Sequence, residues 1–163
     1  MTAWCRTGFV EVVVVLGYDA DRVEPLVRRA ARGASMPVRV VRNRRHARGL
    51  GTSVRAGVGA ASQDLSLLFG HADMPAIRPA TLRRIAALGS TLRRYIIVPE
   101  KRGAPTNPTF FPVDLREELA RVPDGEGGKH VYAAHAERVF RLDLGDAADL
   151  VDVDRAKDLH RLP

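Results

Sequence analysis

The stretch VEVVVVLG, residues 10–17, decides the fold of this chain. Its continuous run of valines is typical of a strand buried on both faces, because a strand with one face in water would alternate apolar and polar residues. Gly17 ends the run, Asp19 can cap a helix, and residues 20–32 repeat apolar side chains at helical spacing. The stretch therefore predicts a strand followed by a helix, which is the repeating unit of a parallel α/β sheet.

The same alternation continues along the chain. Further strands are expected at residues 38–41, 65–69, 95–98, 109–111, 139–142 and 150–153. Helices are expected from Thr52 or Ser53 to about residue 62, and at residues 79–88, 115–122, 128–135 and 155–162. The predicted fold class is α/β, with a mostly parallel sheet covered by helices on both faces.

Length and composition narrow the class of protein. The 163 residues fit one domain, residues 1–163, and the hydrophobic fraction of 45% supports a real core. No apolar run approaches the roughly 18 residues of a membrane span, and the N-terminus lacks the apolar segment of a signal peptide. Cys5 is the single cysteine, which excludes an internal disulfide framework. We therefore expect a cytoplasmic protein that does not bind a membrane.

The net charge of +7 is unevenly distributed along the chain. Residues 1–102 hold 18 basic and 7 acidic side chains, whereas residues 103–163 hold 8 basic and 12 acidic ones. The basic part has no aromatic-rich stripe on which bases could stack, so a nucleic-acid partner is not favoured. The charge favours a basic surface that serves a phosphorylated small molecule, and the alternative is a basic surface that serves no ligand.

Two loops that follow expected strands carry polar groups suited to a ligand, since ligands of open α/β sheets bind beyond the carboxyl ends of the strands. The first is GLGTSVRAG, residues 49–57. Gly51 would let a ligand approach the backbone, Thr52 and Ser53 offer hydroxyls, and Arg55 offers a fork of donors. The alternative is a plain capped helix preceded by turn glycines.

The second loop is GHADMP, residues 70–75. Asp73 stands just past a buried strand, where a carboxylate can hold Mg²⁺, a cation usually bound by one or two protein carboxylates. The alternative is an aspartate that serves only the turn. A transition-metal site built on His71 and Asp73 is not favoured, because no second histidine stands at ligand spacing.

The acidic stretch DLVDVDRAKDL, residues 149–159, is the natural partner of Asp73. Asp152 and Asp154 would share a face if this stretch is extended, and Asp149 is a further candidate. Asp154 also reads as the cap of a closing helix. In DGEGGK, residues 124–129, Lys129 could meet an anion, or the glycines could simply form a flexible loop.

Four blocks in their order resemble the molybdenum-cofactor nucleotidyltransferase family, the molybdopterin cytidylyltransferases and their MobA-like relatives. They are VEVVVVLG at residues 10–17, GLGTSVRAGV at 49–58, LLFGHADMP at 67–75 and VDVDRAKDL at 151–159. GAPTNPTFF at 103–111 and DGEGGKHVYAAH at 124–135 are looser matches. The resemblance implies a Rossmann-like three-layer α/β/α fold. It also implies a Mg²⁺-dependent transfer of a nucleotide, CTP favoured as donor, to a molybdopterin-type phosphate with release of pyrophosphate.

The resemblance also implies roles for particular residues. Asp73 would hold Mg²⁺ and Asp152 would supply the second carboxylate, with Asp149 and Asp154 as rivals. The backbone of Gly51 and Thr52 with the Ser53 hydroxyl would face the nucleotide, and Arg55 is a further ligand candidate. Asn107 and Lys129 would border the acceptor phosphate.

One departure from the family pattern leaves the activity open. The family begins with a strand and a glycine-rich loop that wraps the triphosphate, and nothing in this sequence matches them. We therefore expect the first strand of the sheet to be missing and its neighbours to be left with unpaired edges, which would favour a homodimer. Two alternatives follow: a non-catalytic binding protein of the same fold, or a nucleotidyltransferase for a sugar phosphate or phospholactate.

Overall fold

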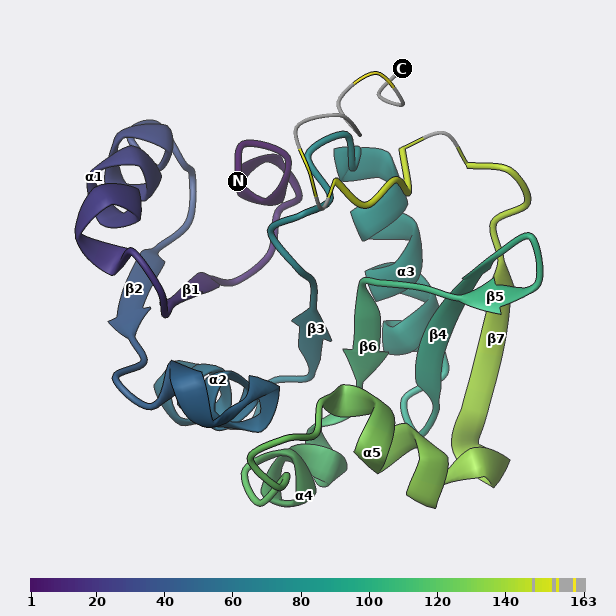
Figure 1. Ribbon diagram of the computed structural model, residues 1–163. Coiled ribbons are helices and arrows are strands. Elements are labelled where there is room, and N and C mark those ends of the chain that lie inside the picture. The colour runs from purple at the N-terminus through teal and green to yellow at the C-terminus, as the bar shows by residue number, and fades with distance from the viewer. Residues whose placement is uncertain (148, 154, 156–159, 161–163) are drawn as a thin grey trace.

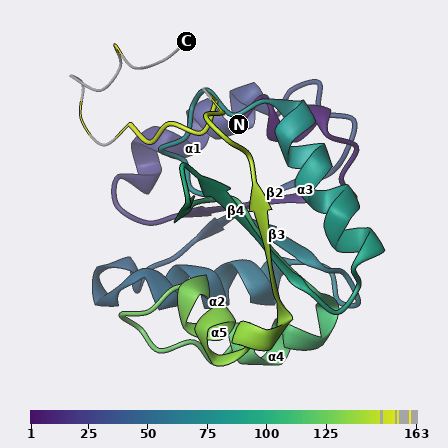
Figure 2. The ribbon, with the colours of Figure 1, turned by 90° about the vertical axis from the view of Figure 1, so that its right-hand side faces the viewer.

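The computed structural model describes residues 1–147, 149–153, 155 and 160. The chain forms three layers, with strands between two layers of helices (Figure 2). One layer holds α1 (Ala20–Ala30) and α3 (Pro79–Thr91), and the other holds α2 (Leu50–Ala60), α4 (Arg116–Leu119) and α5 (Gly128–Ala134). The expected α/β fold with helices on both faces is confirmed.

The strands form two separate sheets. In the first, β1 (Val12–Leu16) pairs in parallel with β2 (Val38–Arg42). The second has the order β3-β6-β4-β5, and β7 pairs in parallel with β4. Its strands are β3 (Leu67–Phe69), β4 (Ile96–Lys101), β5 (Ala104–Pro105), β6 (Thr109–Phe111) and β7 (Val139–Asp143). Because β6 is antiparallel to β3 and to β4, the strands β3, β4 and β7 all run in one direction.

The two sheets end on strands that face one another. β1 has β2 on one edge and β3 has β6 on one edge, and among the described residues no strand pairs with the opposite edge of either. Figure 1 shows β1 and β3 on the two sides of this interruption, with α2 below both.

Several expected boundaries were wrong. α2 begins at Leu50 with Gly49 in the N-cap position, so neither Thr52 nor Ser53 caps it. Residues 150–153 contain no strand. The expected helix 115–122 is a 3-10 turn, Val113–Leu115, followed by the four residues of α4. The expected helix 155–162 lies mostly outside the described residues.

Short 3-10 turns complete the element list: Trp4–Arg6, His46–Arg48 and Ala136–Arg138. Asp19 occupies the N-cap position of α1, but its side chain makes no capping hydrogen bond and instead pairs with Arg22.

The core is divided in the same way as the sheet. Val54 and Val58 of α2 pack with Ile96, Val98 and Phe111 of the second sheet. Cys5, Val12 and Met36 form a separate, smaller cluster on the side of β1. The β1–β2 unit therefore depends on helices, rather than on strand pairing, for its attachment to the rest of the core.

Among the described residues, no helix is long and apolar enough to cross a membrane.

Candidate active site

The loop after β3 carries Asp73, and a backbone hydrogen bond brings the acidic C-terminal stretch against it. Val153 N donates to Asp73 O at 2.7 Å, so Asp152 lies one residue from a direct contact with this loop. The Oδ1 atom of Asp73 is buried and has no hydrogen-bond partner. A buried carboxylate oxygen without a partner is costly unless a cation or a proton satisfies it. Asp73 therefore fits a metal ligand.

The carboxylates available at this point are few. Across the described residues, no group of three or more His, Cys, Asp or Glu side chains is placed to hold a metal ion. Mg²⁺ is usually bound by one or two protein carboxylates, such as those of Asp73 and Asp152, and phosphate oxygens and water complete its coordination shell. The rival ligand Asp154, like Asp158, lies outside the described residues.

Asp149 is held by the start of α3. It is only 1% exposed, and its Oδ2 accepts hydrogen bonds from Thr81 Oγ1 at 2.6 Å and Arg78 N at 3.1 Å. Its Oδ1 lies 3.3 Å from Arg78 Nη2. These bonds satisfy a backbone donor that the helix leaves free at its N-terminus. Both oxygens of Asp149 are thus engaged by the protein, whereas Asp73 Oδ1 is not.

Replacing Asp149 by asparagine is expected to destabilise the fold in a pH-dependent way. Burial raises the pKa of this carboxyl, but the hydrogen bonds from Thr81 and Arg78 outweigh it and lower the pKa below its ordinary value of 3.8. The stabilisation that the ionised Asp149 carboxylate gives the fold is therefore complete above pH 3.8, and it is lost as the pH falls through the lowered pKa of this group. At neutral pH the loss should be about 1–3 kcal/mol in urea unfolding. A difference between the two proteins that stays constant into strong acid would contradict this account.

The glycines at the start of α2 admit the chain's own backbone. Gly51 N donates to Asp124 O at 2.9 Å, and a Cβ on Gly51 would lie 1.9 Å from Pro123 O. Gly49 has φ 123°, and a Cβ built on it would lie 2.3 Å from Asp124 O. The loop 122–128 therefore lies directly on the N-terminus of α2, where a ligand was expected to approach Gly51. The role of Gly51 in ligand binding stays a prediction.

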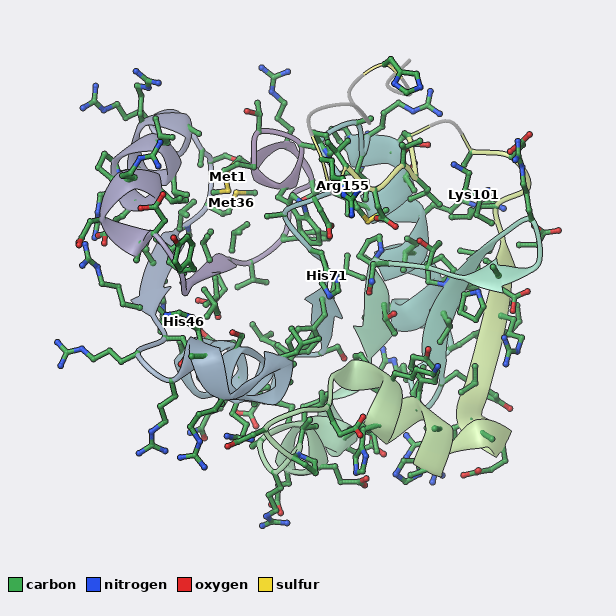
Figure 3. The ribbon with its side chains drawn as sticks, in the orientation of Figure 1. Met1, Met36, His46, His71, Lys101 and Arg155 are labelled. Carbon is green, nitrogen blue, oxygen red and sulfur yellow. The ribbon has the colours of Figure 1, made fainter. Side chains whose placement is uncertain are left out.

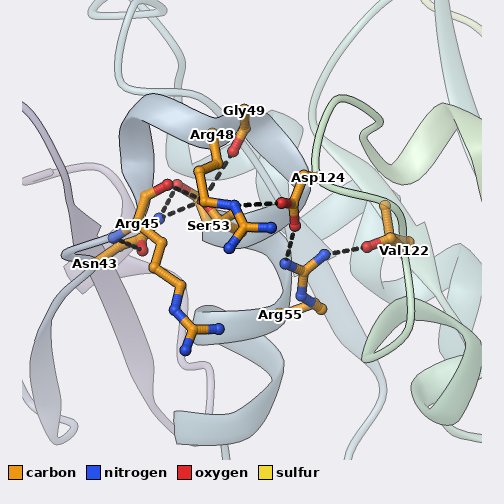
Figure 4. Close-up of polar contacts among 9 residues, drawn as sticks. Asn43, Arg45, Arg48, Gly49, Ser53, Arg55, Val122 and Asp124 are labelled. Carbon is orange, nitrogen blue, oxygen red and sulfur yellow. Dashed lines mark hydrogen bonds and ion pairs between the residues drawn. The ribbon is translucent and has the colours of Figure 1, made fainter.

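Arg55 is engaged by the same loop (Figure 4). Its guanidinium donates to Val122 O and pairs with the carboxylate of Asp124. Arg48 Nε lies 2.7 Å from the other oxygen of Asp124. The hydrogen bond from Arg55, together with the charge of Arg48, lowers the pKa of Asp124 against a smaller effect of burial. The fork of Arg55 thus ties α2 to the loop 122–128, and a ligand role for it stays a prediction.

Asn43 connects the elements of the first loop, and sequence reasoning missed it. It directly follows β2 and is 8% exposed. Its Nδ2 donates to Thr52 Oγ1 at 2.8 Å and to Ser53 Oγ at 3.0 Å, and its backbone N donates to Leu16 O at 2.7 Å (Figure 4). Asn43, at the end of β2 and bonded to the last residue of β1, therefore orients Ser53. Its place just after a strand was the signal that could have identified it.

Replacing Asn43 by alanine is expected to cost about 1–3 kcal/mol of unfolding free energy, because buried partners lose their hydrogen bonds. Ser53→Ala is the matched control: it removes one of the two acceptors, on a side chain that is only partly buried. The control should cost about 0.5 kcal/mol or less. Urea unfolding of both variants measures the difference, and equal losses would contradict the central place given to Asn43.

A cavity of about 1390 Å³ gathers several of the predicted residues. It lies between β1 and β3, and its polar lining includes Ser53, His71, Asn107 and Lys129. Figure 3 shows His71 at the upper end of β3. Ala72 and Met74, the neighbours of Asp73, also line it. The fold therefore brings Ser53, Asn107 and Lys129 onto one cavity. The cavity lining does not include Gly51, Thr52 or Arg55, which instead make contacts within the protein.

The three-layer fold, with polar groups around one cavity between β1 and β3, places the protein in the α/β class, whose members bind ligands beyond the carboxyl ends of their strands. Residues 2–139 match the family model of the MobA-like NTP transferase domain, and the chain belongs to that family. This confirms the family resemblance drawn from the four sequence blocks. Rossmann-like nucleotidyltransferases are among its structural neighbours.

Three similar proteins illustrate the family. Nicotine blue oxidoreductase of Paenarthrobacter nicotinovorans is 28% identical over an alignment of 166 positions, which covers 95% of this chain and 76% of that protein. A nucleotidyl transferase from Methanothermobacter thermautotroptrophicus is 28% identical with a TM-score of 0.75, covering 98% of this chain and 74% of that one. A Mycobacterium tuberculosis protein, solved as a complex with manganese, is 26% identical with a TM-score of 0.70, covering 99% and 80%.

Proposed function

We propose that the protein is a divalent-metal-dependent nucleotidyltransferase that moves a nucleoside monophosphate, CTP favoured as its donor, onto a molybdopterin-type phosphorylated acceptor. The observation that carries the proposal is the Asp73 carboxylate. One of its oxygens is buried without a partner, and Val153 bonds its backbone, which brings Asp152 alongside. The membership of the MobA-like family supports the reaction class.

Asp73 and Asp152 would hold Mg²⁺. When bound, the ion supplies positive charge that neutralises the phosphates and favours departure of pyrophosphate. The manganese complex of the Mycobacterium tuberculosis relative supports the use of a divalent ion. The preference for Mg²⁺ over Mn²⁺ is part of the proposal.

Residues that line the cavity would bind and orient the substrates. The Ser53 hydroxyl, oriented by Asn43, would meet the nucleotide, while the Asn107 amide and the Lys129 ammonium would meet the acceptor phosphate. Transfer of this kind depends on positioning and charge neutralisation, and it needs no nucleophile from the protein. Both substrates are water-soluble phosphates, which supports a cytoplasmic location.

A nucleotide panel tests the proposal. The protein is mixed with CTP, GTP, ATP or UTP, with Mg²⁺ or Mn²⁺, and with a phosphorylated pterin, a sugar phosphate or phospholactate as acceptor. Pyrophosphate release is measured, with NADPH oxidation followed in parallel because one relative is named an oxidoreductase. We expect release that requires the metal and the pterin, highest with CTP. If pyrophosphate is released only with a sugar phosphate or only with phospholactate, that compound is the acceptor and the pterin is not. If NADPH is oxidised and no pyrophosphate is released, the proposed reaction class is overturned.

Nucleotide binding without turnover is the second candidate, and a specific observation favours it. The donors expected to face the nucleotide, at Gly51 and Arg55, are already engaged by Asp124 and Val122. Calorimetric titration with the same nucleotides separates the two candidates. Saturable binding without pyrophosphate release from any acceptor would support the binding protein.

A further inference from the structure

Residues 149–153, which bring Asp152 to the proposed metal site, contain no helix or strand. A segment of this kind has no ladder of backbone hydrogen bonds to hold it, and keeping it in one place costs conformational entropy. Individual contacts must therefore fix its position. We call residues 149–153 the acidic segment, because Asp149 and Asp152 belong to it.

Contacts at both ends place the acidic segment against α3 and the loop after β3. Asp149 is bonded to the start of α3, and Val153 N donates to Asp73 O at 2.7 Å. Between them, the side chain of Leu150 is 4% exposed and packs with Met74, the residue that follows Asp73. This packing fixes the side chain of Leu150, and its carbonyl oxygen needs a partner of its own.

Lys101 supplies that partner from the second sheet. It is the last residue of β4, and its partly buried Nζ donates to Leu150 O at 2.6 Å. Because β4 runs in the same direction as β3, Lys101 and the loop that carries Asp73 lie at the same end of this sheet. Figure 3 shows Lys101 in the upper half of the molecule, as it does His71 of that loop. A hydrogen bond from a charged donor is about twice as strong as a neutral one, so Lys101 is a firm anchor.

The acidic segment is thus held at Leu150 O by Lys101 and, further along the chain, at Val153 N. Only Val151 and Asp152 lie between these two anchored atoms. Consecutive Cα atoms are about 3.8 Å apart, which limits how far Asp152 can move while both bonds are intact. Loss of the bond from Lys101 would leave Asp152 anchored closely on one side only.

Lys101 is separate from the groups that would meet the substrates. Among the described residues that line the cavity, Lys101 is not included, whereas Asn107 and Lys129 are. A role of Lys101 in the proposed reaction is therefore one of position and not of contact with a substrate.

We propose that Lys101 is a positioning residue for the metal site: its ammonium holds Leu150 O so that Asp152 stands beside Asp73, where both carboxylates can meet one cation. The inference rests on the proposed function, because it gives Lys101 a role toward the ion that these two carboxylates would hold. Residues that orient metal ligands without touching the ion commonly change metal affinity about 10–100-fold when they are replaced.

Lys101→Met tests the inference, because methionine keeps the apolar stem of the side chain and removes the ammonium. In the metal-free protein, the amide of Val153 should exchange hydrogen at least about tenfold faster than in the unmodified protein. Mn²⁺ binding, measured by electron paramagnetic resonance, should weaken about 10–100-fold. Lys101→Arg keeps a charged donor and should restore both readouts to within about threefold of the unmodified protein.

Arg102→Met is the matched control. Arg102 follows Lys101 in the chain and also reaches the C-terminal part, but its partner is the exposed Asp146, outside the acidic segment. This variant should leave the exchange at Val153 and the binding of Mn²⁺ within about twofold. Should Lys101→Met fail to fold, Lys101→Gln replaces it, because the shorter, uncharged side chain also loses the anchor and keeps a polar end.

Unchanged exchange at Val153 in Lys101→Met, or unchanged Mn²⁺ affinity despite faster exchange, would overturn the inference. An equal loss in Arg102→Met, or a loss that Lys101→Arg does not restore, would overturn it as well, since general destabilisation would then explain the result. Failure of the unmodified chain to bind Mn²⁺ would instead overturn the proposed function. In that case the exchange at Val153 would still report whether Lys101 holds the acidic segment.

Discussion

Replacing Asp73 by asparagine is expected to lower metal-dependent pyrophosphate release by about 10²–10³-fold, a loss typical for removal of one charge-stabilising group. Asparagine keeps the size of the side chain and removes the charge that would hold the ion. Mn²⁺ binding, measured by electron paramagnetic resonance on the same samples, should weaken in parallel. This second readout reports on the metal even where turnover is slow.

Asp146→Asn is the matched control for this prediction. Asp146 is exposed and pairs with Arg102 on the surface, with Nε 2.6 Å from Oδ1, so the control removes an aspartate charge away from the cavity. It should leave Mn²⁺ binding and pyrophosphate release within about twofold. Unchanged metal binding by Asp73→Asn would contradict the metal assignment.

Replacing Gly51 by alanine is expected to produce the largest loss of stability of any small substitution proposed for this protein. The new Cβ would lie 1.9 Å from the carbonyl oxygen of Pro123, and backbone on both sides cannot move away cheaply. Overpacking of this kind costs about 2–3 kcal/mol. For a domain of this size the melting temperature should fall by roughly 4–12 °C.

Gly59→Ala in the same helix is the control. No atom lies within 4 Å of a Cβ built on Gly59, so alanine should gain helix propensity there without a clash. We expect it to raise the unfolding free energy by about 0.5–1 kcal/mol. Thermal unfolding should therefore show a lower melting temperature for Gly51→Ala and a higher one for Gly59→Ala. A neutral Gly51→Ala would show that the loop 122–128 does not lie on α2 in solution.

The fold was predictable where a strong local pattern and the tertiary structure agree. The valines of β1, the apolar run at β3 and Pro79 at the start of α3 each carried enough local signal. The N-terminus of α2 did not. Its hydroxyls at Thr52 and Ser53 resemble caps, but a partner from a distant loop allowed the helix to begin at Leu50 with glycine before it. Contacts of this kind cannot be read from spacing.

The site was predictable to a similar extent. Most strands of the second sheet lie between Asp73 and Asp152 in the sequence. The family resemblance nevertheless paired these two residues, and the hydrogen bond from Val153 N to Asp73 O brings their segments together in the structure. Asn43 was missed because its place just after a strand belongs to an arginine-rich loop, and the partners that engage its amide, Thr52 and Ser53, are known only from the structure. Asp149 was expected as a rival metal ligand because its spacing in the sequence does not reveal its contacts with Thr81 and Arg78. These two residues engage both of its carboxylate oxygens.

Transfer of label from CTP to the acceptor is the most direct test of the central claim. The chain is incubated with CTP labelled at the α-phosphate, a phosphorylated pterin and Mg²⁺, and the products are separated. The account predicts a labelled nucleotide–pterin conjugate whose formation requires the metal and is lost in Asp73→Asn but not in Asp146→Asn. The absence of any labelled conjugate from the folded protein, with CTP or another nucleoside triphosphate, would contradict it.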